Sequence, residues 1–166
     1  MQNLLFIKPL YISAFPADER RNFGDLLALA ETQTKMRLKI EKLDDELLAF
    51  IIYWEFESFV YVEHFAVNEQ FRGKGHGGKI FREFLQNARK SVILEVEPPE
   101  NLAAEKRIKF YERSGMILQH FPYMQPPYSH DKNPVNMLIM SSKYITKNDF
   151  EKIKNEIFEK VYNPEL

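Results

Sequence analysis

The chain has 166 residues, of which 45% are hydrophobic, so it is long enough to form one globular domain with its own core. Its 23 lysine and arginine residues nearly balance its 24 aspartate and glutamate residues, and the formal net charge of −1 argues against a nucleic-acid partner, which would require a strongly basic face. The absence of cysteine excludes a disulfide framework, a thiolate metal site and a cysteine nucleophile.

The beginning of the chain gives no sign of export or membrane insertion. Its first segment, MQNLLFIKPLYISAFP, lacks the basic region and the small-residue cleavage site of a signal peptide. The longest apolar run, residues 47–54, is far shorter than the roughly 20 residues that cross a bilayer. We therefore expect a cytoplasmic protein with no membrane partner.

The first half of the chain predicts a helix followed by an antiparallel meander. The helix is expected at residues 18–31, after the break at Pro16. Three strands are then predicted at residues 35–43, 47–57 and 58–67. Because the first two are joined only by the short turn DDE, they are expected to pair in antiparallel order.

The second half alternates strands and helices. Further strands are predicted at residues 91–97, 116–121 and 136–142, and the four prolines between the last two indicate a long, stiffened loop at 122–134. Residues 101–115 predict a helix with Asn101 as N-cap and Gly115 just past its end. Thr146 and Asp149 form a capping-box pattern that starts the last helix. The whole pattern predicts an α/β (α+β) fold in a single domain over residues 1–166, with a central mixed, mostly antiparallel sheet of about six to seven strands flanked by helices.

A glycine-rich segment lies between the meander and the next helix. The sequence AVNEQFRGKGHGGKIFREFL, residues 66–85, places four glycines within positions 73–78. Glycines let backbone N–H groups approach an anion closely, and the helix that follows directs the positive end of its dipole to the same place. The segment therefore predicts an anion site, whichever anion binds there.

Three phosphate-binding patterns fit this segment. Gly73, Gly75 and Gly78 give the GxGxxG of a dinucleotide fold, for which Glu95 or Glu97 could supply the acidic ribose ligand. This pattern is disfavoured because residues 68–72 separate the strand from the first glycine and too little chain follows. The GxxxxGK of a P-loop is disfavoured because Lys79 is followed by isoleucine, which has no hydroxyl for magnesium. The third pattern is RxxGxG, from Arg72 to Gly77.

The surroundings of the third pattern carry a family resemblance. HFAVNEQFRGKGHGGKIFREFL resembles motif A of the GNAT superfamily of acyl-CoA-dependent N-acetyltransferases, and IKFYERSGM, residues 108–116, resembles its motif B. The resemblance covers roughly residues 47–140 and implies a GNAT-like domain whose sheet is splayed at the acyl-CoA site. One position departs from the family pattern: many members carry asparagine seven residues before the motif B tyrosine, where this chain has Ala104 and the nearest candidate is Asn101.

The resemblance also implies acetyl-CoA as the cosubstrate. Its pyrophosphate is expected on the amides of the glycine loop, with Arg72 and Lys74 adding charge at the rim, and its pantetheine on the backbone of the strand that precedes the loop. The implied binding residues are Phe65, Ala66, Val67, Arg72, Gly73, Lys74, Gly75, His76, Gly77 and Gly78.

Acetyl transfer to an amine needs a base and, for the departing thiolate, an acid. A lysine-like amine has a pKa of ~10.4, so it must lose a proton before it can attack. We expect Glu63 to be the base, because strand alternation places it on the same face as Phe65 and Val67, whereas His64, the reserve, points the other way. Tyr111 occupies the position of the acid in the family motif.

These features predict an N-acetyltransferase that moves an acetyl group to a primary amine by direct attack in a ternary complex. The acceptor is expected to be a small molecule or a peptide, bound by residues 11–23 and 121–134, and a homodimer is possible. No metal is expected, since the histidines show no metal-ligand spacing. The alternative is a non-catalytic acyl-CoA-binding or regulatory module.

Overall fold

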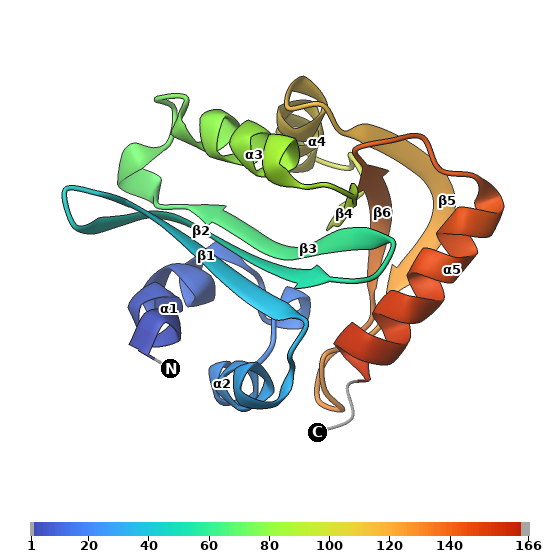
Figure 1. Ribbon diagram of the computed structural model, residues 1–166, viewed down its shortest axis with the longest axis horizontal. Coiled ribbons are helices and arrows are strands. Elements are labelled where there is room, and N and C mark those ends of the chain that lie inside the picture. Colours follow the sequence, from blue (N-terminus) through green and yellow to red (C-terminus); the bar gives the residue numbers. More distant parts are fainter. Residues whose placement is uncertain (1, 164–166) are drawn as a thin grey trace.

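The computed structural model describes residues 2–163 and shows one six-stranded sheet flanked by helices (Figure 1). The strands are β1 (Met36–Leu43), β2 (Glu46–Glu55), β3 (Phe59–Val67), β4 (Ser91–Val96), β5 (Ile117–Gln125) and β6 (Val135–Ser141), in the spatial order β1-β2-β3-β4-β6-β5. All neighbours pair antiparallel except β3 and β4, which are parallel. The predicted fold class and the mixed, mostly antiparallel sheet are confirmed.

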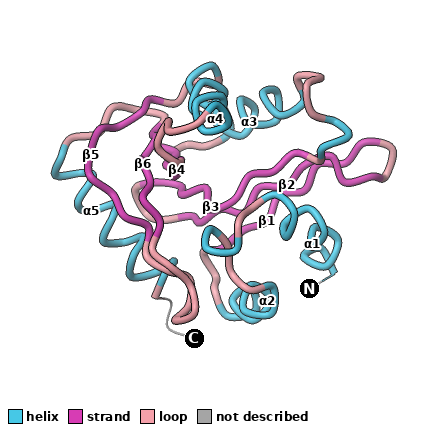
Figure 2. The backbone as a smooth tube through the Cα atoms, turned by 180° about the vertical axis from the view of Figure 1, so that it is seen from behind, coloured by secondary structure: helices cyan, strands magenta, loops and turns pink. Residues whose placement is uncertain are grey.

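Within residues 2–163, five α-helices cover the two faces of this sheet. They are α1 (Gln2–Ala14), α2 (Phe23–Thr32), α3 (His76–Asn87), α4 (Leu102–Arg113) and α5 (Lys147–Ile157). Helices α3 and α4 pack on one face, and α1, α2 and α5 lie on the other, as both backbone views show (Figures 1 and 2). The apolar side chains accordingly form two clusters, one on each face of the sheet. Within residues 2–163, no helix is long and apolar enough to cross a membrane.

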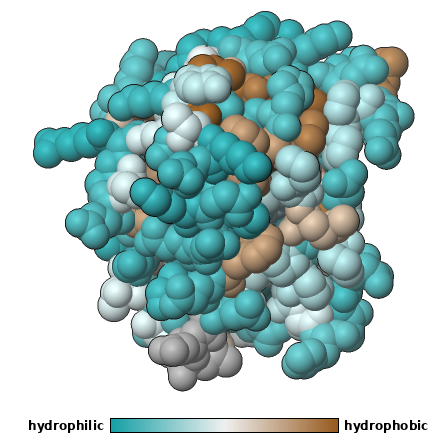
Figure 3. Space-filling model, turned by 90° about the vertical axis from the view of Figure 1, so that its right-hand side faces the viewer, coloured by the Kyte–Doolittle hydropathy of each residue, from teal (hydrophilic) through white to brown (hydrophobic). Residues whose placement is uncertain are grey.

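The last helix is amphipathic and well capped. Thr146 and Asp149 form the predicted capping box, and α5 buries Phe150, Ile153 and Ile157 against the sheet. The side of the molecule on which α5 lies is mainly hydrophilic (Figure 3). A turn of π-helix, Phe158–Tyr162, continues α5 and buries Val161 and Tyr162.

The N-terminal region differs from the sequence prediction. Helix α1 was not predicted, although Leu4, Ile7 and Tyr11 recur at the spacing of one buried helix face. It lacks an acidic first turn and contains Pro9, so the usual start and stop signals are absent. The helix predicted at residues 18–31 begins only at Phe23, after a short 3-10 turn at Ala17–Glu19.

The strand β5 extends into the segment that was predicted to be a loop. It continues through Pro122 to Gln125, with a register shift between Gln119 and Tyr123. Because β5 is an edge strand and Pro122 lies within the irregular stretch, the missing N–H of proline breaks no ladder hydrogen bond. The extension places Tyr123 opposite Met137 of β6, from where its hydroxyl reaches Glu95 of β4.

Candidate active site

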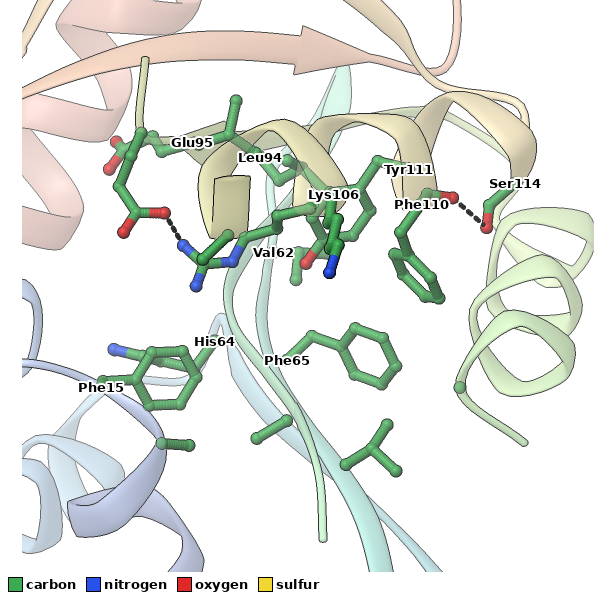
Figure 4. Close-up of a pocket in the computed structure, with 18 of the residues that line it drawn as sticks. Phe15, Val62, His64, Phe65, Leu94, Glu95, Lys106, Phe110, Tyr111 and Ser114 are labelled. Carbon is green, nitrogen blue, oxygen red and sulfur yellow. Dashed lines mark hydrogen bonds and ion pairs between the residues drawn. The ribbon is translucent and has the colours of Figure 1, made fainter. Parts of the chain in front are cut away.

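The parallel strands β3 and β4 separate halfway along their length. They pair only from Phe59 with Ser91 to Val62 with Leu94. Beyond that point β4 stays with β6, while the β4-facing edge of β3 after Val62 has no strand partner among the described residues. A cavity of about 850 Å³ occupies this gap and extends to the glycine loop (Figure 4). The expected splay of the sheet is confirmed.

The glycine loop sits at one end of the cavity, against the end of β3. Gly73 and Gly75 have φ values of 76° and 84°, a left-handed conformation that glycine adopts without strain. Gly75 is the N-cap of α3, and the first helical hydrogen bond runs from the Lys79 amide to the Gly75 carbonyl. The amides of His76, Gly77 and Gly78 therefore have no helical acceptor and are available to an anion.

Glycine at position 77 also allows close packing. A Cβ at this position would lie 3.0 Å from the Val67 Cγ2 atom. The Arg72 side chain fixes the loop from the other side, because its Nε donates to the Val67 carbonyl over 2.9 Å. The start of α3 is thus held directly beside the open edge of β3.

Most of the binding residues expected from the sequence line the cavity. They are Phe65, Ala66, Val67, Arg72, Gly73, Gly75, His76, Gly77 and Gly78. Lys74 is not among the lining residues, and its Nζ lies 5.7 Å from the centre of the Phe71 ring. Arg82, which was not among the residues expected from the sequence, also lines the cavity and folds back over Gly78, four residues earlier on α3. That i,i+4 spacing is a signal that could have identified it.

Phe65 and Phe110 form an apolar wall on the α3/α4 face of the gap. Their ring centroids are 6.1 Å apart, and the two side chains face each other in Figure 4. The cations Lys106, Arg107 and Arg113 of α4 line the same side, where Arg107 pairs with Glu97. This side of the cavity therefore combines an apolar channel with positive charge at its rim.

Tyr111 lines the cavity on this same face. Its side chain is 8% exposed and packs edge-on against Phe81 with centroids 5.0 Å apart. Its hydroxyl has no hydrogen-bond partner within residues 2–163, and burial raises its pKa to about 12. Tyr111 is therefore a neutral hydroxyl that can donate a proton into the cavity.

Asn101 has a structural role at the start of α4. Its side-chain oxygen accepts hydrogen bonds from the Ala103 and Ala104 amides, both at 3.0 Å. It is the predicted N-cap, and its oxygen is fully used within the helix start.

Glu63 lies on the opposite face from the one expected. Ile52 pairs with His64 and Tyr53 pairs with Val62, so Glu63 is the extra residue of a β-bulge. Its carboxylate accepts hydrogen bonds from Arg21 Nε at 3.2 Å and Trp54 Nε1 at 2.7 Å. The expectation that Glu63 shares a face with Phe65 and Val67 was wrong, because the bulge interrupts the alternation of β3.

A second carboxylate, Glu95 of β4, lies on the same face as Glu63. It lines the cavity and accepts hydrogen bonds from the hydroxyls of Tyr123 and Tyr162. Burial raises its pKa to about 7, against the effect of the tyrosine hydrogen bonds, which lower it. Near neutral pH Glu95 can therefore both accept and release a proton.

His64 is a neutral wall of the cavity. It is 2% exposed and packs edge-on against Phe15 and Tyr11, with centroids at 4.6 and 5.0 Å. Its Nε2 lies 3.1 Å from the Glu19 carbonyl, and since a carbonyl only accepts, Nε2 carries the proton. Burial lowers the pKa of His64, which favours the neutral ring. Figure 4 shows His64 beside Phe15 on the far side of β3 from Phe110.

The gap thus separates two kinds of surface. The α3/α4 face offers free amides, cations and the Tyr111 hydroxyl, and the opposite face offers Glu95 within aromatic walls. No group of three or more side chains suited to a metal ion occurs among residues 2–163.

A mixed sheet whose parallel strands part beside a glycine-rich helix start is the arrangement implied by the resemblance to the acyl-CoA-dependent transferases. The comparison with family models gives the particular family: the model described as "Acetyltransferase (GNAT) family" matches residues 4–116. The chain belongs to this family. The match begins within α1, so it includes the N-terminal helices as well as the two motifs seen in the sequence.

Individual relatives agree with this assignment. The chain is 33% identical over 113 residues to "Putative acetyltransferase YjbC" of Bacillus subtilis. The aligned segment covers 67% of this chain and 54% of that protein. The chain therefore spans about half the length of this curated relative. A solved structure from Bacteroides thetaiotaomicron, described as "Putative acetyltransferase from GNAT family", has 32% identity and a TM-score of 0.90, covering 97% of this chain and 92% of that chain.

A more distant solved structure carries the cosubstrate. It is a GNAT family acetyltransferase of Elizabethkingia anophelis with acetyl-CoA bound, with 13% identity and a TM-score of 0.53 over 71% of this chain and 82% of that chain. At this identity the similarity shows the fold alone.

Proposed function

We propose that this protein transfers an acetyl group from acetyl-CoA to a primary amine of a small molecule or peptide, by direct attack in a ternary complex. The observation that carries the proposal is the single cavity that joins the open edge of β3, the free amides at the start of α3, Tyr111 and Glu95. The proposed acetyl-CoA site, the acid Tyr111 and the base Glu95 thus lie in the same cavity.

The α3/α4 face suits the cosubstrate. The pyrophosphate would lie on the amides of residues 76–78, with Arg72 and Arg82 nearby as counter-charges. The pantetheine arm is itself rich in amides, and it would add to the unpaired edge of β3 like a further strand. Phe65 and Phe110 would exclude water from the thioester end.

The two faces of the gap would carry out different proton transfers of the reaction. The acceptor ammonium loses a proton to Glu95, and the free amine forms a C–N bond to the thioester carbonyl carbon. Collapse of the tetrahedral intermediate breaks the C–S bond, and the thiolate takes its proton from Tyr111 on the other face. The attacking nitrogen loses its second proton as the amide forms, and this proton restores the Tyr111 hydroxyl. Both carboxylates line the cavity, but Glu95 suits the role of base better, because its pKa is about 7 and its oxygens are bound by neutral hydroxyls, whereas Glu63 forms a buried ion pair with Arg21.

The acceptor would enter on the face that carries Glu95. There the cavity is lined by Phe15 and Pro16, which precede α2. It is also lined by Gln125, the last residue of β5, and by Tyr128 in the loop that follows. Glu19 adds a half-buried carboxylate whose pKa is raised by burial. An amine with an apolar body fits this combination of aromatic walls and carboxylates.

Release of free thiol from acetyl-CoA across a panel of amines tests the proposal. The panel should separate peptide N-termini, lysine side chains, polyamines and aminoglycosides. Thiol release that depends on one class of amine is expected. Tight acetyl-CoA binding without thiol release for any amine would favour the alternative, a non-catalytic acyl-CoA-binding or regulatory module.

Binding itself should be visible as thermal stabilisation. At acetyl-CoA concentrations near 100 times Kd, we expect Tm to rise by roughly 5–10 °C, whereas NAD and magnesium-ATP should leave it unchanged. Gly75→Val should abolish the shift, because a branched side chain at φ 84° strains the loop and displaces the amides at the start of α3.

Gly24→Val is the matched control for this measurement. Gly24 lies in α2, has ordinary φ, and an added Cβ there meets no atom within 4 Å. Its acetyl-CoA shift should match that of the natural chain. A full shift in Gly75→Val, or an equal shift with magnesium-ATP, would contradict the placement of the pyrophosphate.

A further inference from the structure

Tyrosine hydroxyls hold both oxygens of the Glu95 carboxylate. Tyr123 of β5 donates to Oε1, and Tyr162 of the π-turn donates to Oε2 over 2.8 Å. The two tyrosines come from different parts of the chain, the edge strand and the C-terminal turn. Each carboxylate oxygen therefore has a fixed hydrogen-bond donor, and the orientation of the group is set.

A third tyrosine extends this arrangement behind Tyr162. The hydroxyls of Tyr61 and Tyr162 are 3.1 Å apart. Since Tyr162 gives its proton to Glu95, its oxygen must accept the proton of Tyr61. The result is a chain of donors from Tyr61 through Tyr162 to Glu95, in which each hydrogen bond strengthens the next.

The buried C-terminal turn is itself anchored to the site. Arg21 donates to the Val161 carbonyl, forms the buried ion pair with Glu63 and lies 4.7 Å from the centre of the Tyr128 ring. Tyr128 packs in turn on Tyr162, with ring centroids 4.9 Å apart. These contacts fix the Tyr162 hydroxyl relative to β4.

Some of the groups around Glu95 favour its protonated form, and others favour its ionised form. Burial and the negative charge of Glu63 favour the protonated acid, and the hydroxyls of Tyr123, Tyr162 and Tyr61 favour the carboxylate. The charge of Glu63 is compensated by Arg21. The tyrosine hydroxyls are therefore what keeps Glu95 a usable base at neutral pH.

We propose that Tyr123 and Tyr162 are positioning residues that hold the Glu95 carboxylate in its base form and in one orientation, so that the C-terminal turn Phe158–Tyr162 is part of the catalytic site. This inference rests on the proposed function only for the use of Glu95 as a base. The hydrogen-bonded arrangement itself is a property of the free protein.

The test compares Tyr123→Phe and Tyr162→Phe with the natural chain. Loss of one hydrogen bond to the carboxylate should raise the pKa of Glu95 by about one unit, because such a bond contributes on the order of that much to the ionised form. In a plot of kcat/KM against pH, the rise on the acidic side, called the acid limb, should shift to higher pH by the same amount. This shift gives about a fivefold loss of kcat/KM at pH 7, which is recovered near pH 9.

A second readout does not depend on activity. The carbon-13 NMR signal of the Glu95 carboxyl, assigned by its absence in Glu95→Gln, gives the same pKa in the free protein. Tyr11→Phe is the matched control, because it removes a buried hydroxyl that bonds only to the backbone of Arg21. It should change stability but not the Glu95 pKa.

The outcomes separate the inference from the proposed function. An unchanged Glu95 pKa in both folded variants overturns the inference, even if acetyl transfer continues. A shifted NMR pKa in a protein that releases no thiol supports the hydrogen-bonded arrangement, overturns its catalytic use and refutes the proposed function. If Tyr162→Phe fails to fold, as judged by circular dichroism, Tyr123→Phe alone decides the question.

Discussion

Replacing Tyr111 with phenylalanine should slow acetyl transfer by roughly 10²–10⁴-fold while leaving acetyl-CoA binding nearly unchanged. The ring, which packs against Phe81, is retained, so the fold and the apolar wall should survive. Only the hydroxyl is lost, and with its pKa near 12 it is protonated and able to donate at every pH of interest. The variant should therefore have a lower kcat. Its Kd for acetyl-CoA, measured by calorimetry, should stay close to that of the natural chain.

Tyr53→Phe is the control for this change. Tyr53 lies on the same face of the sheet, packs edge-on against Phe84 with centroids 5.1 Å apart, and does not line the active-site cavity. Its variant should turn over at the natural rate. Undiminished turnover in Tyr111→Phe would reduce Tyr111 to a packing residue and require another proton source for the thiolate.

Replacing Glu95 with glutamine should cost a similar factor, roughly 10²–10⁴-fold in kcat/KM near neutral pH. A base acts only when it is ionised, so activity of the natural chain should be low below pH 7 and rise as the pH passes through about 7. In Glu95→Gln this limb should disappear. The deficit should shrink as the pH approaches ~10, where the amine loses its proton unaided.

The variant Glu63→Gln tests which of the two carboxylates, Glu63 or Glu95, is the base. It removes the charge from a buried ion pair in which Arg21 is 5% and Glu63 0% exposed, so we expect a loss of about 3 kcal/mol in the free energy of unfolding. The acid limb near pH 7 should remain. Retention of the limb in Glu95→Gln together with its loss in Glu63→Gln would return the role of base to Glu63.

Most residues expected from the sequence to bind the cosubstrate do line the cavity, and the signals that indicated them are local. The glycines at 73–78 need left-handed backbone and a following helix, and both requirements are visible within a dozen residues. Tyr111 likewise follows from the motif around it, and strand alternation located β1 to β4 closely. Such features depend on neighbours in the sequence and need no knowledge of how strands pair.

The face of the gap that carries Glu63 and Glu95 could not be predicted in the same way, because it depends on long-range pairing. The face of Glu63 is decided by a bulge opposite β2, and a single extra residue reverses the alternation on which the expectation rested. Glu95 obtains its environment from Tyr162, 67 residues further along the chain, and from Tyr123, which lies in the segment expected to be a loop. Nothing in the local pattern around Glu95 indicates either contact.

The stoichiometry of a single turnover tests the central claim most directly. The full chain is mixed with a slight excess of acetyl-CoA, with and without the amine that the panel selects, and free thiol, acetylated amine and the intact protein mass are measured together. Direct transfer predicts no thiol release and no acetyl group on the protein without amine, and one thiol for each acetylated amine when it is present. Thiol release that leaves an acetyl group on the protein, or none with any amine, would contradict the account.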